Sequence, residues 1–158
     1  MNKKGFTLVE LSISLVLVCV VLFTMMNLLV SVKDFDVESR EYNNNIISKE
    51  IIVKTINDDI KRNGITNIDT YNSNDKSLTL TVGGVSKTIK ITNDGKTVLY
   101  YSDANAPILS ETLCSTCGKY TSITPSKTGT INTNDVIKIL ITHLEENYNC
   151  EITYYKSN

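Results

Sequence analysis

The sequence predicts an α+β protein in which one long N-terminal helix is followed by a C-terminal antiparallel sheet. Three observations predict this class: residues 6–32 are almost uninterruptedly apolar, residues 42–60 keep a helical period, and from residue 77 the period changes to two. With 158 residues, the chain has the size of one domain with an appendage, which excludes a large multidomain enzyme.

The apolar segment 6–32 is long enough to cross a membrane. Its 27 residues carry one formal charge, Glu10, and as a helix they would measure about 40 Å, against about 30 Å of bilayer hydrocarbon. Lys3 and Lys4 precede the segment and mixed, slightly acidic residues follow it, so the positive-inside rule places the N-terminus in the cytoplasm and residues 33–158 outside. A removed secretory signal is disfavoured, because the segment is too long and no Ala-x-Ala site follows it.

A carboxylate inside this segment is unusual, because placing it in hydrocarbon costs at least about 2.5 to 3.5 kcal/mol. Glu10 therefore either sits at the membrane interface or has a partner. Residues 3–11 around it read Lys-Lys-Gly-Phe-Thr-Leu-Val-Glu-Leu. This motif resembles the class III signal of type IV prepilins and type II secretion pseudopilins. The resemblance implies a leader of residues 1–5, cleavage after Gly5 by prepilin peptidase, N-methylation of Phe6, and a pilin-like fold.

The same resemblance implies a role for Glu10. Its carboxylate would neutralise the N-terminal amine of a neighbouring subunit, so that two groups that are costly in lipid become one pair. A pairing between residues 6 and 10 of one helix stays open, because these positions lie on one helix face. The implied partners are other pilin subunits and, indirectly, an inner-membrane platform protein and an assembly ATPase. The implied destination is a surface filament: a type IV pilus, a competence pilus or a secretion pseudopilus.

Residues 33–64 are expected to continue the helix outside the membrane as an amphipathic stalk. Ile47 and Ile51 lie outside its apolar stripe and are predicted to be exposed, either as ordinary surface residues or as contacts to another subunit. Gly64 predicts the end of the helix near residue 63. Residues 54–65 also resemble the corresponding helix end of J-class pseudopilins and W-type minor pilins. The stripe, within an arc of about 120°, consists of Tyr42, Ile46, Ile52, Val53, Ile56 and Ile60.

Residues 65–158 are predicted to form a β-rich domain that begins with a three-stranded meander. Residues 77–101 alternate between apolar and polar side chains and are interrupted by Gly83-Gly84 and Asp94-Gly95, which are typical of tight hairpin turns. Lys87 is an exception to the apolar face of the second strand.

Two further strands are predicted near the C-terminus. Residues 136–144 are apolar on both faces, as in a central strand, and residues 150–155 form the last strand. The prediction is therefore one antiparallel sheet of four or five strands. Residues 103–134, rich in serine and threonine, are too long for a structureless loop in a compact domain and are expected to hold local structure or an interaction surface.

Cys114, Cys117 and Cys150 lie in the part predicted to be outside the cell, where disulfides persist. One intramolecular bridge can form, either within the C-x-x-C segment or from Cys150 to one of the other two. Alternatively, these three residues and His143 could form a tetrahedral zinc site. Pairing 144 with 150 would put His143 and Cys150 on opposite sheet faces, whereas pairing 143 with 152 would put them on one face. A disulfide is favoured over free thiols, and zinc is disfavoured because the sequence lacks a second C-x-x-C.

Composition and motifs argue against an enzyme and against direct nucleic-acid binding. The formal net charge is −1, which supplies no excess positive field for a phosphate backbone. The sequence contains no phosphate-binding Gly-Lys-Ser/Thr loop, no HExxH helix and no GxSxG turn. We therefore expect no catalysis and no cofactor. The alternative to a filament subunit is an uncleaved, single-pass membrane-anchored module whose outer domain binds a ligand or an adhesion target.

Overall fold

The computed structural model describes residues 7–102, 105–114 and 116–156, and the chain divides into two units, Met1–Arg40 and Glu41–Asn158. Helix α1 (Leu8–Asn63) contributes to both units as one continuous element. It ends at the predicted place, where the Gly64 N–H donates to the Ile60 carbonyl at 2.8 Å and Gly64 adopts a φ of +71°. This left-handed cap is a conformation that glycine adopts without strain.

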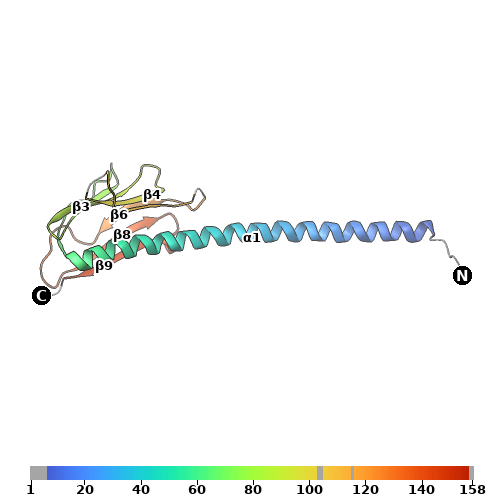
Figure 1. Cartoon of the computed structure of the whole chain (residues 1–158), viewed down its shortest axis with the longest axis horizontal. Helices are drawn as coiled ribbons and strands as arrows, with labels where there is room; N and C mark the ends of the chain where they lie inside the picture. Colours follow the sequence, from blue (N-terminus) through green and yellow to red (C-terminus); the bar gives the residue numbers. More distant parts are fainter. Residues whose placement is uncertain (1–6, 103–104, 115, 157–158) are drawn as a thin grey trace. The chain divides into compact units, whose positions relative to one another are not determined.

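The second unit contains two antiparallel sheets (Figure 1). The six-stranded sheet has the order β5-β4-β3-β2-β1-β7, and the three-stranded sheet has the order β6-β8-β9. A short 3-10 helix, η1 (Glu146–Tyr148), precedes β9. The strands are β1 (Ile65–Ile68), β2 (Ser77–Val82), β3 (Val85–Ile91), β4 (Thr97–Tyr101), β5 (Leu109–Thr112), β6 (Tyr120–Pro125), β7 (Gly129–Thr130), β8 (Val136–His143) and β9 (Cys150–Tyr155).

The α+β class is confirmed, but the prediction of a single sheet of four or five strands is wrong. The predicted meander forms β2, β3 and β4. The additional strands β1, β5, β6 and β7 are short segments with few apolar residues, so their sequences carry little alternating signal. Strands β5, β6 and β7 supply the local structure expected within residues 103–134.

Strand β8 lies at the centre of its sheet, as predicted, but only one of its faces is buried. Ile137, Ile139 and Ile141 are buried, whereas Val136 is exposed on the opposite face. A sheet packed on one side needs only one apolar face. The other apolar side chains of β8 therefore lie on an outer surface of the domain.

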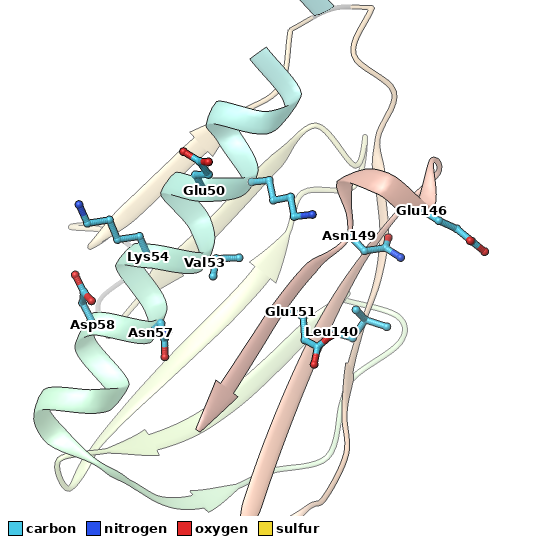
Figure 2. A pocket seen from close by; sticks show the side chains of 10 residues that line it. Glu50, Val53, Lys54, Asn57, Asp58, Leu140, Glu146, Asn149 and Glu151 are labelled. Carbon is cyan, nitrogen blue, oxygen red and sulfur yellow. The ribbon is translucent and has the colours of Figure 1, made fainter. Parts of the chain in front are cut away.

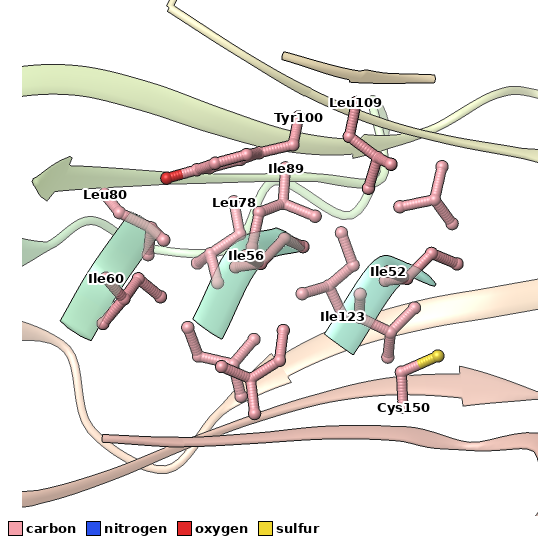
Figure 3. Close-up of a cluster of buried hydrophobic side chains, with 14 of the residues drawn as sticks. Ile52, Ile56, Ile60, Leu78, Leu80, Ile89, Tyr100, Leu109, Ile123 and Cys150 are labelled. Carbon is pink, nitrogen blue, oxygen red and sulfur yellow. The ribbon is translucent and has the colours of Figure 1, made fainter. Parts of the chain in front are cut away.

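The core is formed where the second half of α1 meets both sheets. Ile52, Ile56 and Ile60 are completely buried and follow one another at intervals of four residues, which places them on one helix face. Figure 3 shows these isoleucines between side chains of the two sheets. Those labelled are Leu78, Leu80, Ile89, Tyr100 and Leu109 on one side and Ile123 and Cys150 on the other.

The predicted apolar stripe of α1 is correct from residue 52 onward and differs before it. Tyr42 is exposed, and Asn45 and Ser48 are buried instead. The Ser48 hydroxyl donates to Glu111 Oε1 at 2.7 Å, so a hydrogen bond to β5 compensates for burial of this polar group. An interpretation based on apolar periodicity cannot find such a contact.

Ile47 and Ile51 are exposed, as predicted, with 53% and 38% of their surfaces accessible. Both lie on the part of α1 that belongs to the second unit.

Lys87, the polar exception on β3, is explained by a polar cluster that joins α1 to the six-stranded sheet. Asp59 Oδ2 accepts hydrogen bonds from Lys87 Nζ at 2.6 Å and from the Tyr100 hydroxyl at 2.5 Å, and Asn63 Nδ2 donates to Asp59 Oδ1 at 2.8 Å. Burial raises the pKa of Asp59, but the hydrogen bonds and the charge of Lys87 outweigh it and hold this pKa below its usual range. The cluster fixes the last turns of α1 against β3 and β4.

Replacing Asp59 by asparagine should lower the free energy of unfolding by about 2 kcal/mol at pH 7, because charge-assisted hydrogen bonds are lost. The folded-state pKa of Asp59 lies below its unfolded value of about 3.9, so this contribution is complete above that value and is lost as the pH falls through the folded-state pKa. Denaturant unfolding of the full chain in detergent micelles at pH 7, 5 and 3 should show the difference from wild type narrowing at pH 3.

The matched control for this measurement is Asp58→Asn, which alters the exposed neighbouring carboxylate and should change stability by less than about 0.5 kcal/mol. A difference between wild type and Asp59→Asn that is equal at all three pH values would contradict the role assigned to the charge.

Candidate functional site

The first candidate site is the start of α1. Gly5 and Phe6, the residues predicted to flank the cleaved bond, lie outside the described residues, whereas Thr7 and Glu10 are described. The Thr7 N–H donates to Glu10 Oε2 at 2.9 Å, the Thr7 hydroxyl donates to the same oxygen at 3.0 Å, and the Glu10 N–H donates to Thr7 Oγ1 at 3.4 Å. This reciprocal arrangement is a capping box, in which two side chains satisfy backbone N–H groups at a helix start.

The capping box gives Glu10 a local role that the sequence interpretation missed. The pattern Thr-x-x-Glu before an apolar run is its signature and was available in the sequence. The carboxylate lies in the first turn of α1, where the helix dipole favours negative charge. Within the described residues the partner of Glu10 is Thr7, and its pairing with an N-terminal amine stays a prediction.

The helix that follows is suited to a lipid environment. α1 is long and apolar enough to cross a membrane, and its large apolar side chains up to residue 37 are exposed. Between residues 8 and 32, its hydroxyl groups donate to backbone carbonyls three or four residues earlier, so they need no water. These residues are Ser12, Ser14, Thr24 and Ser31. The structure and composition together support a membrane-anchored protein.

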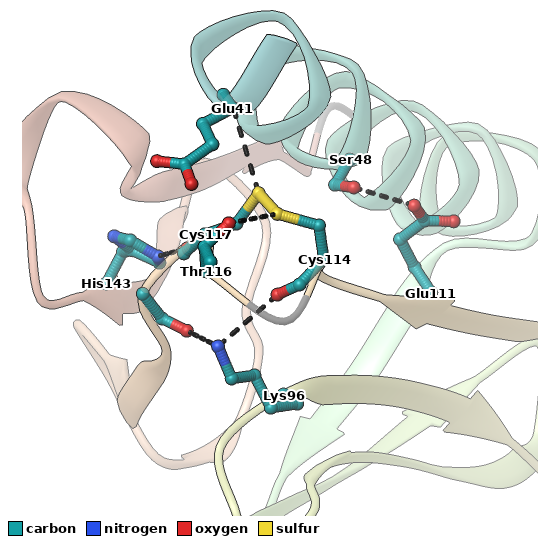
Figure 4. The surroundings of a disulfide bond; sticks show 9 residues. Glu41, Ser48, Lys96, Glu111, Cys114, Thr116, Cys117 and His143 are labelled. Atoms are coloured by element: carbon teal, nitrogen blue, oxygen red, sulfur yellow. Dashed lines mark hydrogen bonds between the residues drawn. A yellow bond between two sulfur atoms is a disulfide. The ribbon is translucent and has the colours of Figure 1, made fainter. Parts of the chain in front are cut away.

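The second candidate site is the C-x-x-C segment (Figure 4). Cys114 and Cys117 form a disulfide, with their Cα atoms 5.1 Å apart. Cys117 is buried, and its sulfur lies 3.8 Å from the carbonyl oxygen of Glu41. Lys96 Nζ donates to the carbonyls of Cys114 and Gly118, at 3.3 and 2.5 Å. The disulfide loop is thus held against both α1 and the turn between β3 and β4.

His143 supports this loop from the three-stranded sheet. The ring is buried, and the Glu145 N–H donates to His143 Nδ1 at 3.1 Å. Because Nδ1 accepts a hydrogen bond, the proton of the neutral ring is on Nε2, which donates to the Cys117 carbonyl at 3.1 Å. A Cβ atom at Gly118 would lie 2.7 Å from His143 Cε1, and Gly118 has a φ of +69°. His143 is therefore a packing residue whose position requires glycine opposite it.

The zinc alternative does not fit this geometry. The sulfurs of Cys114 and Cys117 are bonded to each other and cannot act as thiolate ligands. The observed register pairs Ile141 with Cys150, so His143 and Cys150 do share the buried face. Even so, no cluster of three or more His, Cys, Asp or Glu side chains able to hold a metal occurs among the described residues. The bridge alternatives that involve Cys150 are likewise absent, because Cys150 is a free thiol.

Cys150 is inert in its surroundings. Its thiol is buried and donates to the Tyr120 hydroxyl at 3.8 Å. Burial raises its pKa to about 11, so the reactive thiolate is scarce at neutral pH. This side chain behaves as a small apolar residue of the core.

Cys150 should resist alkylation at pH 8 while the protein is folded. The detergent-solubilised chain would be treated with iodoacetamide and digested, and the modified cysteines identified by peptide mass. We expect Cys150 to react at least about tenfold more slowly than in urea, because both its access and its thiolate fraction are low. Cys114 and Cys117 should react only after reduction. Equal rates for Cys150 in the folded and unfolded states would contradict its burial.

Comparison with known proteins adds one finding at the N-terminus. Residues 1–26 match the family model described as the prokaryotic N-terminal methylation motif. No curated protein and no solved structure matches the chain. The matched range includes the predicted leader, the predicted cleavage position and the first part of the apolar helix. The chain therefore carries the class III signal of type IV prepilins and pseudopilins, which supports a pilin-like protein that is made as a precursor and processed.

Proposed function

We propose that this protein is a minor pilin or pseudopilin, a structural subunit without catalytic activity. It is cleaved after Gly5, N-methylated at Phe6 and assembled into a type IV pilus, a competence pilus or a type II secretion-like pseudopilus. The observation that carries this proposal is the methylation motif over residues 1–26. The long apolar helix and the helix-on-sheet fold of the second unit agree with it.

The geometry of the capping box suggests how Glu10 acts during assembly. Both hydrogen bonds from Thr7 go to Oε2, and the described residues provide no hydrogen bond to Oε1. We expect this second oxygen to accept a hydrogen bond from the N-terminal amine of a neighbouring subunit. Two charges that would each be costly in lipid are then paired. Thr7 thus positions the carboxylate of Glu10, and the incoming amine pairs with its second oxygen.

The proposed topology has the N-terminus in the cytoplasm and the second unit outside. Lys3 and Lys4 support this orientation through the positive-inside rule. The disulfide between Cys114 and Cys117 supports it independently, since such bonds persist in oxidising compartments. During assembly, residues 6–32 would leave lipid and pack against the equivalent helices of neighbouring subunits. Prepilin peptidase, other pilins, a platform protein and an assembly ATPase are the proposed partners.

The N-terminal peptide mass of the protein from its native membrane tests the proposal. We expect a chain that begins at Phe6 and carries one added methyl group, because the motif places the cleaved bond after Gly5. The control is Gly5→Asp, which puts a charged side chain at the cleavage position and should leave residues 1–5 attached. A wild-type chain that retains its leader would contradict the proposal and favour an uncleaved membrane-anchored module.

Glu10→Ala should separate processing from assembly. Cleavage should be nearly unchanged, whereas incorporation into sheared filaments should fall at least about tenfold, equivalent to 1.4 kcal/mol, because the neighbouring amine loses its counter-charge. Immunoblots of the filament and membrane fractions measure both quantities. Glu38→Ala, an exposed glutamate further along the same helix, is the matched control. Normal incorporation of Glu10→Ala would contradict the pairing.

A further inference from the structure

A groove of about 820 Å³ lies in the second unit between α1 and the three-stranded sheet. Figure 2 shows its lining side chains, which come from α1 on one side and from β8, η1 and β9 on the other. The apolar part of the lining includes Val53 and Leu140. Near one end, Lys49 Nζ donates to the carbonyl of Asn147 at 3.0 Å. The proposed function assigns no role to this groove.

One wall of the groove is formed by the free edge of a sheet. Strand β9 is the outermost strand of the order β6-β8-β9. Ser126 donates its N–H to the Lys138 carbonyl on the β6 side of β8, so the neighbouring residue Ile139 bonds to its partner Ile152 on the β9 side. Because backbone groups alternate along a strand, Glu151 then directs its own N–H and C=O away from β8. These groups lie on the edge that borders the groove.

The length of the groove suits a short extended peptide. Its helical wall runs from Lys49 to Asp58, which at 1.5 Å per residue is about 13 Å. An extended chain rises about 3.3 Å per residue, so about four residues can lie along this wall. Exposed strand edges bind such segments by continuing the hydrogen-bond ladder of the sheet.

The charges of the lining determine which peptide fits. The groove contains two lysines and four carboxylates. Glu151 is paired with Lys138 at 2.8 Å, whereas no ion pair is formed by Glu50, Asp58 or Glu146 among the described residues. Asn57 Oδ1 on the helical wall is buried and has no hydrogen-bond partner among the described residues, so it is not exposed to a peptide in the groove. Because Glu151 is paired outside the groove, three unpaired carboxylates remain beside the two lining lysines, Lys49 and Lys54. This excess of negative charge favours a positively charged partner.

We propose that this groove binds an extended peptide segment rich in lysine or arginine, supplied by another protein, which adds as a strand to the free edge of β9. Backbone hydrogen bonds to Glu151 would supply affinity, and the carboxylates of Glu50 and Asp58 would select the positive charge. The described residues that line the groove do not include Glu10. The peptide-binding proposal therefore does not depend on whether the leader is cleaved.

The test uses the full chain in detergent micelles and a fluorescein-labelled hexapeptide that alternates valine and lysine. Fluorescence anisotropy should show saturable binding that weakens with salt, because the contacts are partly ionic. The comparison peptides are one that alternates valine and glutamate and one that carries proline at a central position. Neither should compete, because the first has the wrong charge and the second cannot form the full ladder.

Two pairs of variants separate the backbone contribution from the charge contribution. Glu151→Pro removes the outward N–H and should weaken binding about tenfold relative to Glu151→Ala, which removes only the side chain. The double variant Glu50→Gln with Asp58→Asn should also weaken binding about tenfold and reduce its salt dependence. Its matched control is Asp34→Asn with Asp36→Asn, exposed positions on the first unit. Protection of Cys150 from alkylation verifies that each variant is folded.

Several results would overturn the proposal. They are equal binding of the valine–lysine and valine–glutamate peptides, equal affinities of folded Glu151→Pro and Glu151→Ala, and no saturable binding by wild type. Self-association of the chain through β9 that the peptide does not displace would also overturn it, because the occupant would then be a second copy. Loss of peptide binding with normal methylation of Phe6 would leave the proposed function intact.

Discussion

The second unit depends on one constraint, which is that a single stripe of α1 must be covered by two sheets at once. Ile52, Ile56 and Ile60 are completely buried, and side chains of both sheets contact the same cluster. Burying an isoleucine of this kind stabilises a fold by roughly 1.5 to 3 kcal/mol. A helix residue of similar type outside the stripe, such as Ile47, remains exposed. The period of the stripe therefore sets how α1 is rotated relative to the sheets.

Polar contacts then fix the position of α1 along the sheet, which apolar packing alone leaves adjustable. Hydrophobic burial has no preferred direction, whereas hydrogen bonds to Asp59 and from Ser48 require particular atoms to meet. The disulfide loop is itself held by hydrogen bonds from Lys96 to the Cys114 carbonyl and from His143 to the Cys117 carbonyl. These contacts lie at both ends of the buried stripe. The hydrogen bonds of Ser48 and Asp59 fix the position of α1 along the six-stranded sheet.

The first unit follows a different physical rule, because its side chains are exposed and apolar. A surface of this kind is stable only in lipid or against other helices. The hydroxyls of Ser12, Ser14, Thr24 and Ser31 donate to backbone carbonyls of the same helix. The carboxylate of Glu10, which is costly in lipid, accepts two hydrogen bonds from Thr7. In these proposals the first unit serves filament assembly and the second unit recognises a peptide.

The sequence by itself determined the α+β class, the long apolar helix, its end at Gly64, the β2–β4 meander and the methylation motif, because each depends on local periodicity, turn chemistry or a contiguous pattern. Tertiary structure decided the second sheet, the burial of Asn45 and Ser48, the role of Lys87, the cysteine pairing and the groove beside β9. Except for the bridge between Cys114 and Cys117, which are three residues apart, these features bring together residues far apart in the chain, such as Ser48 with Glu111. Which residues meet in these long-range contacts is fixed only when the whole core packs, so no local pattern encodes the contacts.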